Sequence, residues 1–203
     1  LLREATDYQP APESRFNALL AGSRYVVHDG QMFEIRFSKE GLEEEELLAT
    51  FEGWGVEELI MDDGLETHRV FVFEGRRATG EPLPRTEVLA REFSQMGWLN
   101  DAWGVKAALT AGRLVQDKVR EILQHLSQDV PEHRVFSHLG WRRIADNWVY
   151  LHAGGALGLE GIRVQPPVDL ALYRFPKDPR EPGKAYQALL RALDVAPHRL
   201  TLP

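Results

Sequence analysis

The clearest pattern of hydrophobic and polar positions lies between residues 135 and 155, which read VFSHLGWRRIADNWVYLHAGG. Two runs rich in β-branched and aromatic residues flank Asp146-Asn147, and this arrangement predicts a hairpin with a two-residue turn. The cross-strand pairs expected from that turn are Ile144 with Val149, Arg143 with Tyr150, Arg142 with Leu151 and Trp141 with His152.

The predicted hairpin has two unlike faces, because successive side chains of a strand point to opposite sides. One face carries Ile144, Val149 and Leu151, with Arg142 as the only charged member. The other face carries Trp141, Arg143, Trp148, Tyr150 and His152. This second face combines rings with a cation, so it is either a binding surface or a layer packed under a helix.

The rest of the pattern predicts further hairpins and a few helices. Asp29-Gly30 indicates a hairpin over 24–37, and Asp63-Gly64 indicates a strand pair over 47–74 that includes a central strand. The clearest helix covers 112–126, where apolar residues fall on one stripe. The other expected elements are short helices over 13–21, 86–93 and 186–193, a loop or helix start over 38–46, a packed aromatic loop over 97–103, a strand over 105–111 and an edge strand within 162–173. The expected fold is therefore α+β, a mainly antiparallel sheet built from hairpins with a few packed helices.

Composition narrows the class of protein. The chain has 203 residues, no cysteine and a formal net charge of −7, so disulfides and thiolate metal sites are excluded and non-specific binding of duplex DNA by the whole chain is disfavoured. No apolar run approaches the roughly 20 residues that a membrane-spanning helix needs. We expect a cytoplasmic protein without a membrane partner.

The chain divides into three expected parts. Residues 1–22 are a linker with a short helix, and residues 23–175 form the α+β domain around the central hairpin 135–153. Residues 176–203 are a charged, proline-rich linker and a helix. The chain begins without Met and ends at LTLP, so we expect it to be a piece of a longer protein.

Motifs for catalysis and for metal binding are missing from the sequence. It has no GxxxxGK[ST] loop, no GxSxG elbow and no HExxH pair, and Gly154 to Gly158 resembles a phosphate loop only superficially. Asp62-Asp63 is more typical of a turn before glycine than of a magnesium site. The histidines, including His133 and His138, show no three-ligand spacing. We therefore predict no catalytic and no metal-binding residues.

The run HLGWRRIADNWVYLHAGGALG carries a family resemblance. Its pattern H-x-G-W-R-x-I-x-x-x-W-V-Y-L-H-A-G-G-A resembles that of a domain of unknown function in replication helicases of phages, plasmids, staphylococcal cassette chromosomes and other mobile elements. The preceding SQDVPEHRVFSHLGW, the later LALYRFP and the closing ALLRALDVAPHRLTLP also resemble that family. The resemblance covers roughly residues 20–203 and is most specific over 130–158.

This resemblance implies a role in DNA replication. In the family the domain precedes an AAA+ P-loop ATPase of the minichromosome-maintenance type, so the ATPase would begin beyond Pro203. The resemblance implies that the full-length protein is an ATP-dependent DNA helicase and that ATP and magnesium serve its ATPase domain. This chain is then expected to hold no cofactor and not to hydrolyse ATP by itself. Its expected partners are its own ATPase domain, neighbouring subunits and other replication proteins.

Three hypotheses for the domain remain open. In the first, Trp141, Trp148 and Tyr150 stack on bases of single-stranded DNA while Arg142 and Arg143 contact phosphates. In the second, the domain is an oligomerisation or partner-docking module without DNA contact, which its acidic charge also fits. The third, a primase-polymerase or nuclease domain, requires folding to bring Asp62, Asp63 and Asp101 together.

Overall fold

The computed structural model describes residues 12–175 and residue 187. The elements in chain order are α1 (Pro12–Leu19), β1 (Tyr25–His28), β2 (Gln31–Phe37), β3 (Glu43–Ala49), β4 (Phe51–Asp62), β5 (Thr67–Arg77), β6 (Pro82–Leu89), α2 (Ala90–Phe93), η1 (Leu99–Trp103), η2 (Gly104–Lys106), α3 (Val115–His125), β7 (Glu132–Phe136), β8 (Gly140–Ile144), β9 (Asn147–His152), β10 (Gly155–Leu157), β11 (Arg163–Val164) and η3 (Val168–Leu170). The predicted α+β class, with mainly antiparallel strands and a few helices, is confirmed.

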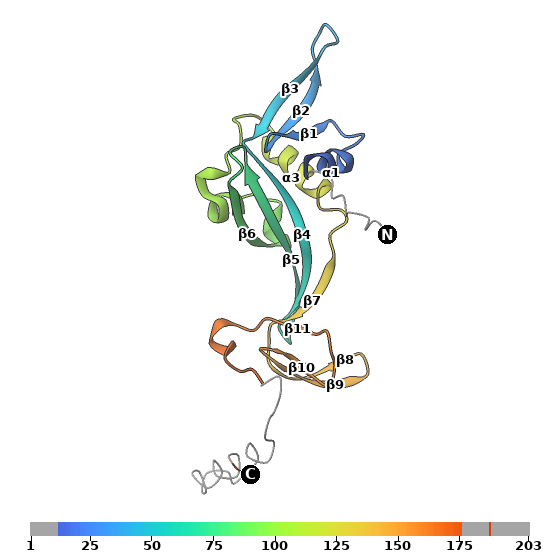
Figure 1. The fold of residues 1–203 in the computed structure, drawn as a ribbon, viewed down its shortest axis with the longest axis vertical. Helices are drawn as coiled ribbons and strands as arrows, with labels where there is room; N and C mark the ends of the chain where they lie inside the picture. Colours follow the sequence, from blue (N-terminus) through green and yellow to red (C-terminus); the bar gives the residue numbers. More distant parts are fainter. Residues whose placement is uncertain (1–11, 176–186, 188–203) are drawn as a thin grey trace, which may run out of the picture.

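The strands form three sheets. The largest has the order β11-β7-β4-β5-β6, and two three-stranded sheets have the orders β1-β2-β3 and β10-β9-β8. All pairings are antiparallel except those of β7 with β4 and of β11 with β7. Figure 1 shows the long strands β4 and β5 running from the β1–β3 sheet and the helices at one end to the β8–β10 sheet at the other.

The two Asp-Gly turns and the amphipathic helix form as predicted. Asp29 and Gly30 join β1 to β2 with positive φ values of 51° and 67°, the left-handed conformation that a tight hairpin turn requires. Helix α3 buries Val119, Ile122 and Leu123 completely. Gly53 of β4 lets this helix approach, because a Cβ there would lie 3.1 Å from Leu123 Cδ2.

The aromatic loop packs into the main core, as expected. Trp98 and Trp103 are buried and meet edge to face, with their ring centroids 5.1 Å apart. Trp98 also stacks on Phe73 of β5, and the Trp103 indole N–H donates to the carbonyl of Pro84. These rings cover one face of the large sheet beside α3.

Three local predictions were wrong. The segment 38–46 was expected to be a loop or the start of a helix, but from Glu43 onward it belongs to strand β3 (Glu43–Ala49), which pairs with β2. The expected helix over 86–93 is strand β6 up to Leu89, and only Ala90–Phe93 is helical. The expected strand over 105–111 is reduced to one bridge between Ala49 and Leu109. The edge strand expected within 162–173 is present as β11, at the edge of the large sheet, although it has only two residues and is followed by η3.

In the segments 38–46 and 86–93 cross-strand pairing decided the structure over local composition. The predicted helix over 186–193, apart from residue 187, and the linkers over 1–11 and 176–185 lie outside the described residues. In the part of the chain that the structure describes, no helix is long and apolar enough to cross a membrane.

One buried ion pair joins α3 to the β1–β3 sheet. Glu34 is 3% exposed and Lys118 is 8% exposed, and the Lys118 Nζ lies 2.5 Å from Glu34 Oε2. Arg36 also donates to the same carboxylate, at 2.9 Å. Burial by itself would raise the pKa of Glu34, but the hydrogen bonds from Lys118 and Arg36 outweigh it and lower that pKa.

We predict that Glu34→Gln lowers the free energy of unfolding at pH 7 by about 3–5 kcal/mol, because the buried Lys118 ammonium would lose its carboxylate. Since the folded state lowers the pKa of Glu34, its stabilisation is present above the unfolded value of about 4.3 and is lost as pH falls through the folded pKa. Urea unfolding from pH 7 to pH 3 should show a steeper loss for the wild type than for the variant. Glu87→Gln, at an exposed position, is the control, and equal slopes for wild type and Glu34→Gln would contradict the prediction.

Candidate functional site

The central hairpin exists, but its turn lies one residue earlier than predicted. Strands β8 and β9 are joined by Ala145-Asp146, with Ile144 opposite Asn147 and not opposite Val149. Trp141 therefore faces Tyr150, and Arg143 faces Trp148. Ala145 adopts a positive φ of 52°, which a turn at this position requires.

The two faces of the hairpin nevertheless have the predicted members. The register differs from the prediction by two residues, and side chains alternate with a period of two, so each residue keeps its face. On the inner face Val149 and Leu151 are fully buried with Phe136 of β7. The partly buried side chains of Ile144, Ala156, Leu159, Ile162 and Val164 complete this small core.

The outer face presents its rings to solvent. Trp141 is 68% exposed and Trp148 is 66% exposed. Trp141 and Tyr150 meet edge to face at 5.4 Å. The alternative in which this face packs under the helix over 112–126 was wrong, because α3 covers β3 and β4 at the other end of the large sheet.

One ring beyond the hairpin extends this surface. Phe175 lies 5.7 Å from the ring of Tyr150 and 5.1 Å from that of His152, measured between centroids. The sequence pattern did not single out Phe175, since LYRFP suggested an edge strand. Five aromatic residues of the described chain are large exposed hydrophobics, and four of them lie between residues 141 and 175: Trp141, Trp148, Tyr173 and Phe175.

The two candidate arginines have different surroundings. Arg142 belongs to the inner face, where its Nη2 lies 2.7 Å from Asp62 Oδ2 and its Nη1 donates to the carbonyl of Gly64. Its guanidinium is therefore committed to the end of β4, which argues against the predicted phosphate contact. Arg143 belongs to the outer face, and its ion pair at 3.3 Å is with Asp146, whose side chain is 97% exposed. An ion pair this exposed to solvent contributes little, so the Arg143 guanidinium can exchange Asp146 for another partner.

The acidic residues considered for metal binding have structural roles. Asp62 is buried and also accepts the N–H of Gly64, while Arg134 lies 3.6 Å from it. Asp63 accepts the N–H groups of Glu66 and Leu65, and these hydrogen bonds lower the pKa of its carboxyl. Within residues 12–175 no group of three or more His, Cys, Asp or Glu side chains could hold a metal ion, so the structure does not bring Asp62, Asp63 and Asp101 together as such a group.

Charge is divided unequally along the described chain. Residues 12–136 contain 14 basic and 23 acidic residues, whereas residues 137–175 contain four basic and three acidic ones. The acidic excess includes Glu43–Glu46 of β3, at the opposite end of the molecule from the hairpin (Figure 1). The net charge of −7 therefore does not describe the surface around the aromatic face.

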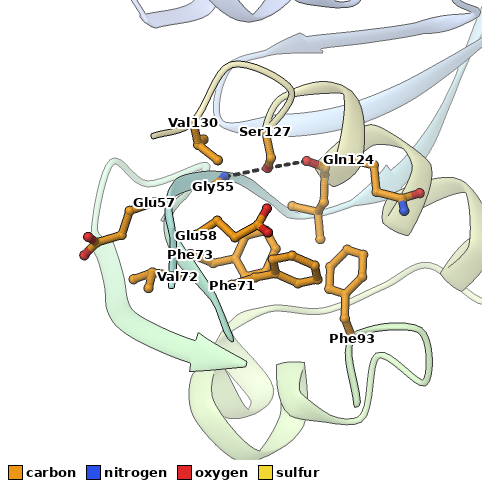
Figure 2. Close-up of a pocket in the computed structure, with 11 residues that line it drawn as sticks. Gly55, Glu57, Glu58, Phe71, Val72, Phe73, Phe93, Gln124, Ser127 and Val130 are labelled. Atoms are coloured by element: carbon orange, nitrogen blue, oxygen red, sulfur yellow. Dashed lines mark hydrogen bonds between the residues drawn. The ribbon is translucent and has the colours of Figure 1, made fainter. Parts of the chain in front are cut away.

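A separate apolar cavity of about 150 Å³ lies between β4, β5 and α3. Figure 2 shows Phe71 and Phe93 lining it, with the Gly55 N–H donating to Ser127 Oγ and the Ser127 hydroxyl donating to the carbonyl of Leu123. Its acidic wall residue Glu58 forms an ion pair with Arg69. This cavity is not continuous with the aromatic face and offers little unsatisfied polarity for a ligand.

Comparisons with known proteins found neither a protein-family model nor a curated protein that matches the chain.

We predict that the outer face contributes little to folding. Trp141→Ala and Trp148→Ala should each change the free energy of unfolding by at most about 1 kcal/mol, since both rings are largely exposed. Trp103→Ala should cost about 3–5 kcal/mol, because it empties part of the main core. Chemical denaturation measures all three, and a loss for Trp148→Ala comparable to that for Trp103→Ala would show that the outer face is structural.

We also predict that Asp62 holds the hairpin on the large sheet. Asp62→Asn should weaken the charge-assisted hydrogen bond from Arg142, costing about 1.5–3 kcal/mol. Amide hydrogen exchange should accelerate in residues 140–152 more than in α3. Asp146→Asn, which alters an exposed carboxylate on the same hairpin, should leave exchange unchanged in β8 and β9, and a similar acceleration in both variants would rule out this role for Asp62.

Proposed function

We propose that this chain is a non-catalytic accessory domain of a DNA replication helicase and that it engages single-stranded DNA through the outer face of the β8–β9 hairpin. The supporting observation is the exposure of Trp141 and Trp148 beside Arg143 on the three-stranded β10-β9-β8 sheet. Exposed aromatic rings next to a cation suit the binding of single-stranded DNA, because bases stack on the rings and the phosphates pair with the cation.

The arrangement on the hairpin supports this function in detail. The pairs Trp141–Tyr150 and Arg143–Trp148 are neighbours on one face, so Arg143 shares that face with three aromatic rings. The inner face has its own buried core, which fixes the strands without using the outer rings. Such preorganisation lowers the entropic cost of binding, because the scaffold is ordered before a strand arrives.

The replication context rests on the sequence resemblance over 130–158. The proposed full-length protein would carry an ATP- and magnesium-dependent AAA+ ATPase domain after this one, on a mobile element such as a phage or plasmid, and would act in the cytoplasm. Neighbouring subunits and other replication proteins would be its protein partners. The chain itself would hold no cofactor.

A docking module without DNA contact is the second candidate. It is favoured by the run Glu43–Glu46 on the exposed edge strand β3, a charged surface that could receive a basic partner. A primase-polymerase or nuclease domain is the third and weakest, because Asp62 is paired with Arg142 and belongs to no metal-holding group of three or more His, Cys, Asp or Glu residues within 12–175.

We predict that the 203-residue chain binds a fluorescein-labelled single-stranded oligonucleotide and that binding weakens as salt increases. Trp148→Ala should weaken binding about 5- to 100-fold, since stacking is worth about 1–3 kcal/mol per base. Arg143→Ala should reduce the slope of log affinity against log salt by about 0.7. Fluorescence anisotropy at two or more salt concentrations measures both effects.

Two variants distant from the hairpin serve as matched controls. Phe37→Ala removes an exposed ring from β2, and Arg113→Ala removes an exposed arginine next to α3, and neither should alter stacking on the hairpin. Undetectable binding at low salt and high protein concentration would reject DNA engagement and favour the docking module. Primer synthesis or magnesium-dependent cleavage by the purified chain would favour the catalytic candidate.

A further inference from the structure

A second recess adjoins the aromatic face. It is an open cleft of about 620 Å³ between the turn after β9, strand β11 and the segment that ends at Phe175. Its walls include His152, Gly154, Gly155, Arg163 and Arg174. Phe175 belongs to both surfaces, because its ring contacts Tyr150 on one side and His152 on the other.

Backbone hydrogen bonds select the tautomer of the His152 imidazole. Its Nδ1 accepts the N–H of Gly154 at 3.1 Å and the N–H of Phe175 at 3.3 Å. An imidazole nitrogen that accepts hydrogen bonds carries no proton, so the single ring N–H is at Nε2. Within residues 12–175 the Nε2 has no hydrogen-bond partner, and it is available as a donor to a group in the cleft.

Arg174 supplies a positive charge that the described protein does not neutralise. Its Nε donates to the carbonyl of Ala171 at 3.1 Å, which orients the side chain. No carboxylate within residues 12–175 pairs with its guanidinium. Arg163 also lines the cleft, but its Nη1 lies 2.6 Å from Glu57 Oε2, a carboxylate that Arg85 also contacts, so Arg163 already has a partner within the protein.

Two glycines give the cleft its shape. A Cβ at Gly154 would lie 3.0 Å from His152 Cε1, so a side chain there would displace the imidazole. Gly155 has a φ of 132°, a conformation that residues with a side chain rarely adopt. The backbone can therefore fold closely around His152.

We propose that this cleft binds a phosphate group, held by the Arg174 guanidinium and by His152 Nε2–H. A phosphate carries the charge and the acceptor oxygens that these two donors match. The proposal rests on the proposed function in one respect. It assumes that the phosphate belongs to a DNA strand whose bases stack on the neighbouring outer face of the hairpin. A strand whose bases lie on Tyr150 and Phe175 would place a phosphodiester, or its terminal phosphate, at the cleft beside Phe175.

The test uses the 203-residue chain and pyrophosphate as the probe. Pyrophosphate should shift the amide resonances of Gly154 and Gly155 and the His152 ring signals in a saturable way. Arg174→Ala should weaken this binding about tenfold or more, because a charge-assisted hydrogen bond is lost, and Arg174→Lys should retain part of it. Arg113→Ala removes the same charge outside the cleft and should leave it unchanged. Equal effects of Arg174→Ala and Arg113→Ala, or no shift at all, would overturn the proposal.

Oligonucleotide binding separates this proposal from the proposed function. If Arg174→Ala binds single-stranded DNA as tightly as Arg113→Ala while Trp148→Ala binds poorly, the phosphate site is wrong and the DNA function stands. If pyrophosphate saturates the cleft but no oligonucleotide binds, the phosphate site stands and the DNA function fails. If a 5′-phosphorylated oligonucleotide binds at least about tenfold more tightly than a 5′-hydroxyl one, the ligand is a terminal phosphate. If both bind equally and Arg174→Ala weakens both, the ligand is an internal phosphodiester.

Discussion

Strand β4 is the constraint on which the rest of the structure depends. It pairs with β5 from Phe51 to Asp62 and with β7 from Glu58 to Asp62, so it lies at the centre of the large sheet. Its first half lies under α3 in the main core, and Leu59 and Met61 in its second half belong to a separate core. Its last residue, Asp62, receives the Arg142 guanidinium from the hairpin. One strand therefore connects both cores to the candidate binding surface.

The length of β4 also separates two unlike electrostatic regions. A strand of 12 residues spans roughly 40 Å, whereas the Debye length at physiological salt is about 8 Å. The acidic residues of β3 and the hairpin are at opposite ends of this strand (Figure 1). Solvent ions screen repulsion over such a distance, so the acidic end does not prevent a phosphate backbone from approaching the hairpin. In the docking hypothesis, a basic protein segment at the acidic β3 end would likewise not disturb DNA binding at the hairpin.

The sequence predicts the parts of the fold that local chemistry determines. Asp29-Gly30 and Asp63-Gly64 specify turns through their backbone preferences, and the apolar stripe of α3 specifies a helix. The two hairpin faces were predicted correctly although the register was not, because a shift of two residues preserves the alternation. Strand β3 was missed because four successive glutamates do not favour a strand, and only pairing with β2 and ion pairs such as Arg36–Glu46 and His28–Glu45 hold them there.

Contacts between distant segments explain what the sequence could not show at the candidate site. Strand alternation places Arg142 and Arg143 on opposite faces, but the sequence does not reveal the partner of Arg142. The position of Asp62 under the hairpin commits Arg142 to structure, whereas Arg143 stays at the surface. Phe175 and Arg174 reach the site only because the chain returns to His152 after β11, where the Phe175 N–H and the Gly154 N–H share one imidazole nitrogen. The buried core of the hairpin is complete without Trp141 or Trp148. The stability of the fold therefore does not explain why two indoles are exposed beside a cation. The proposed binding of a ligand with planar rings and phosphates would explain it.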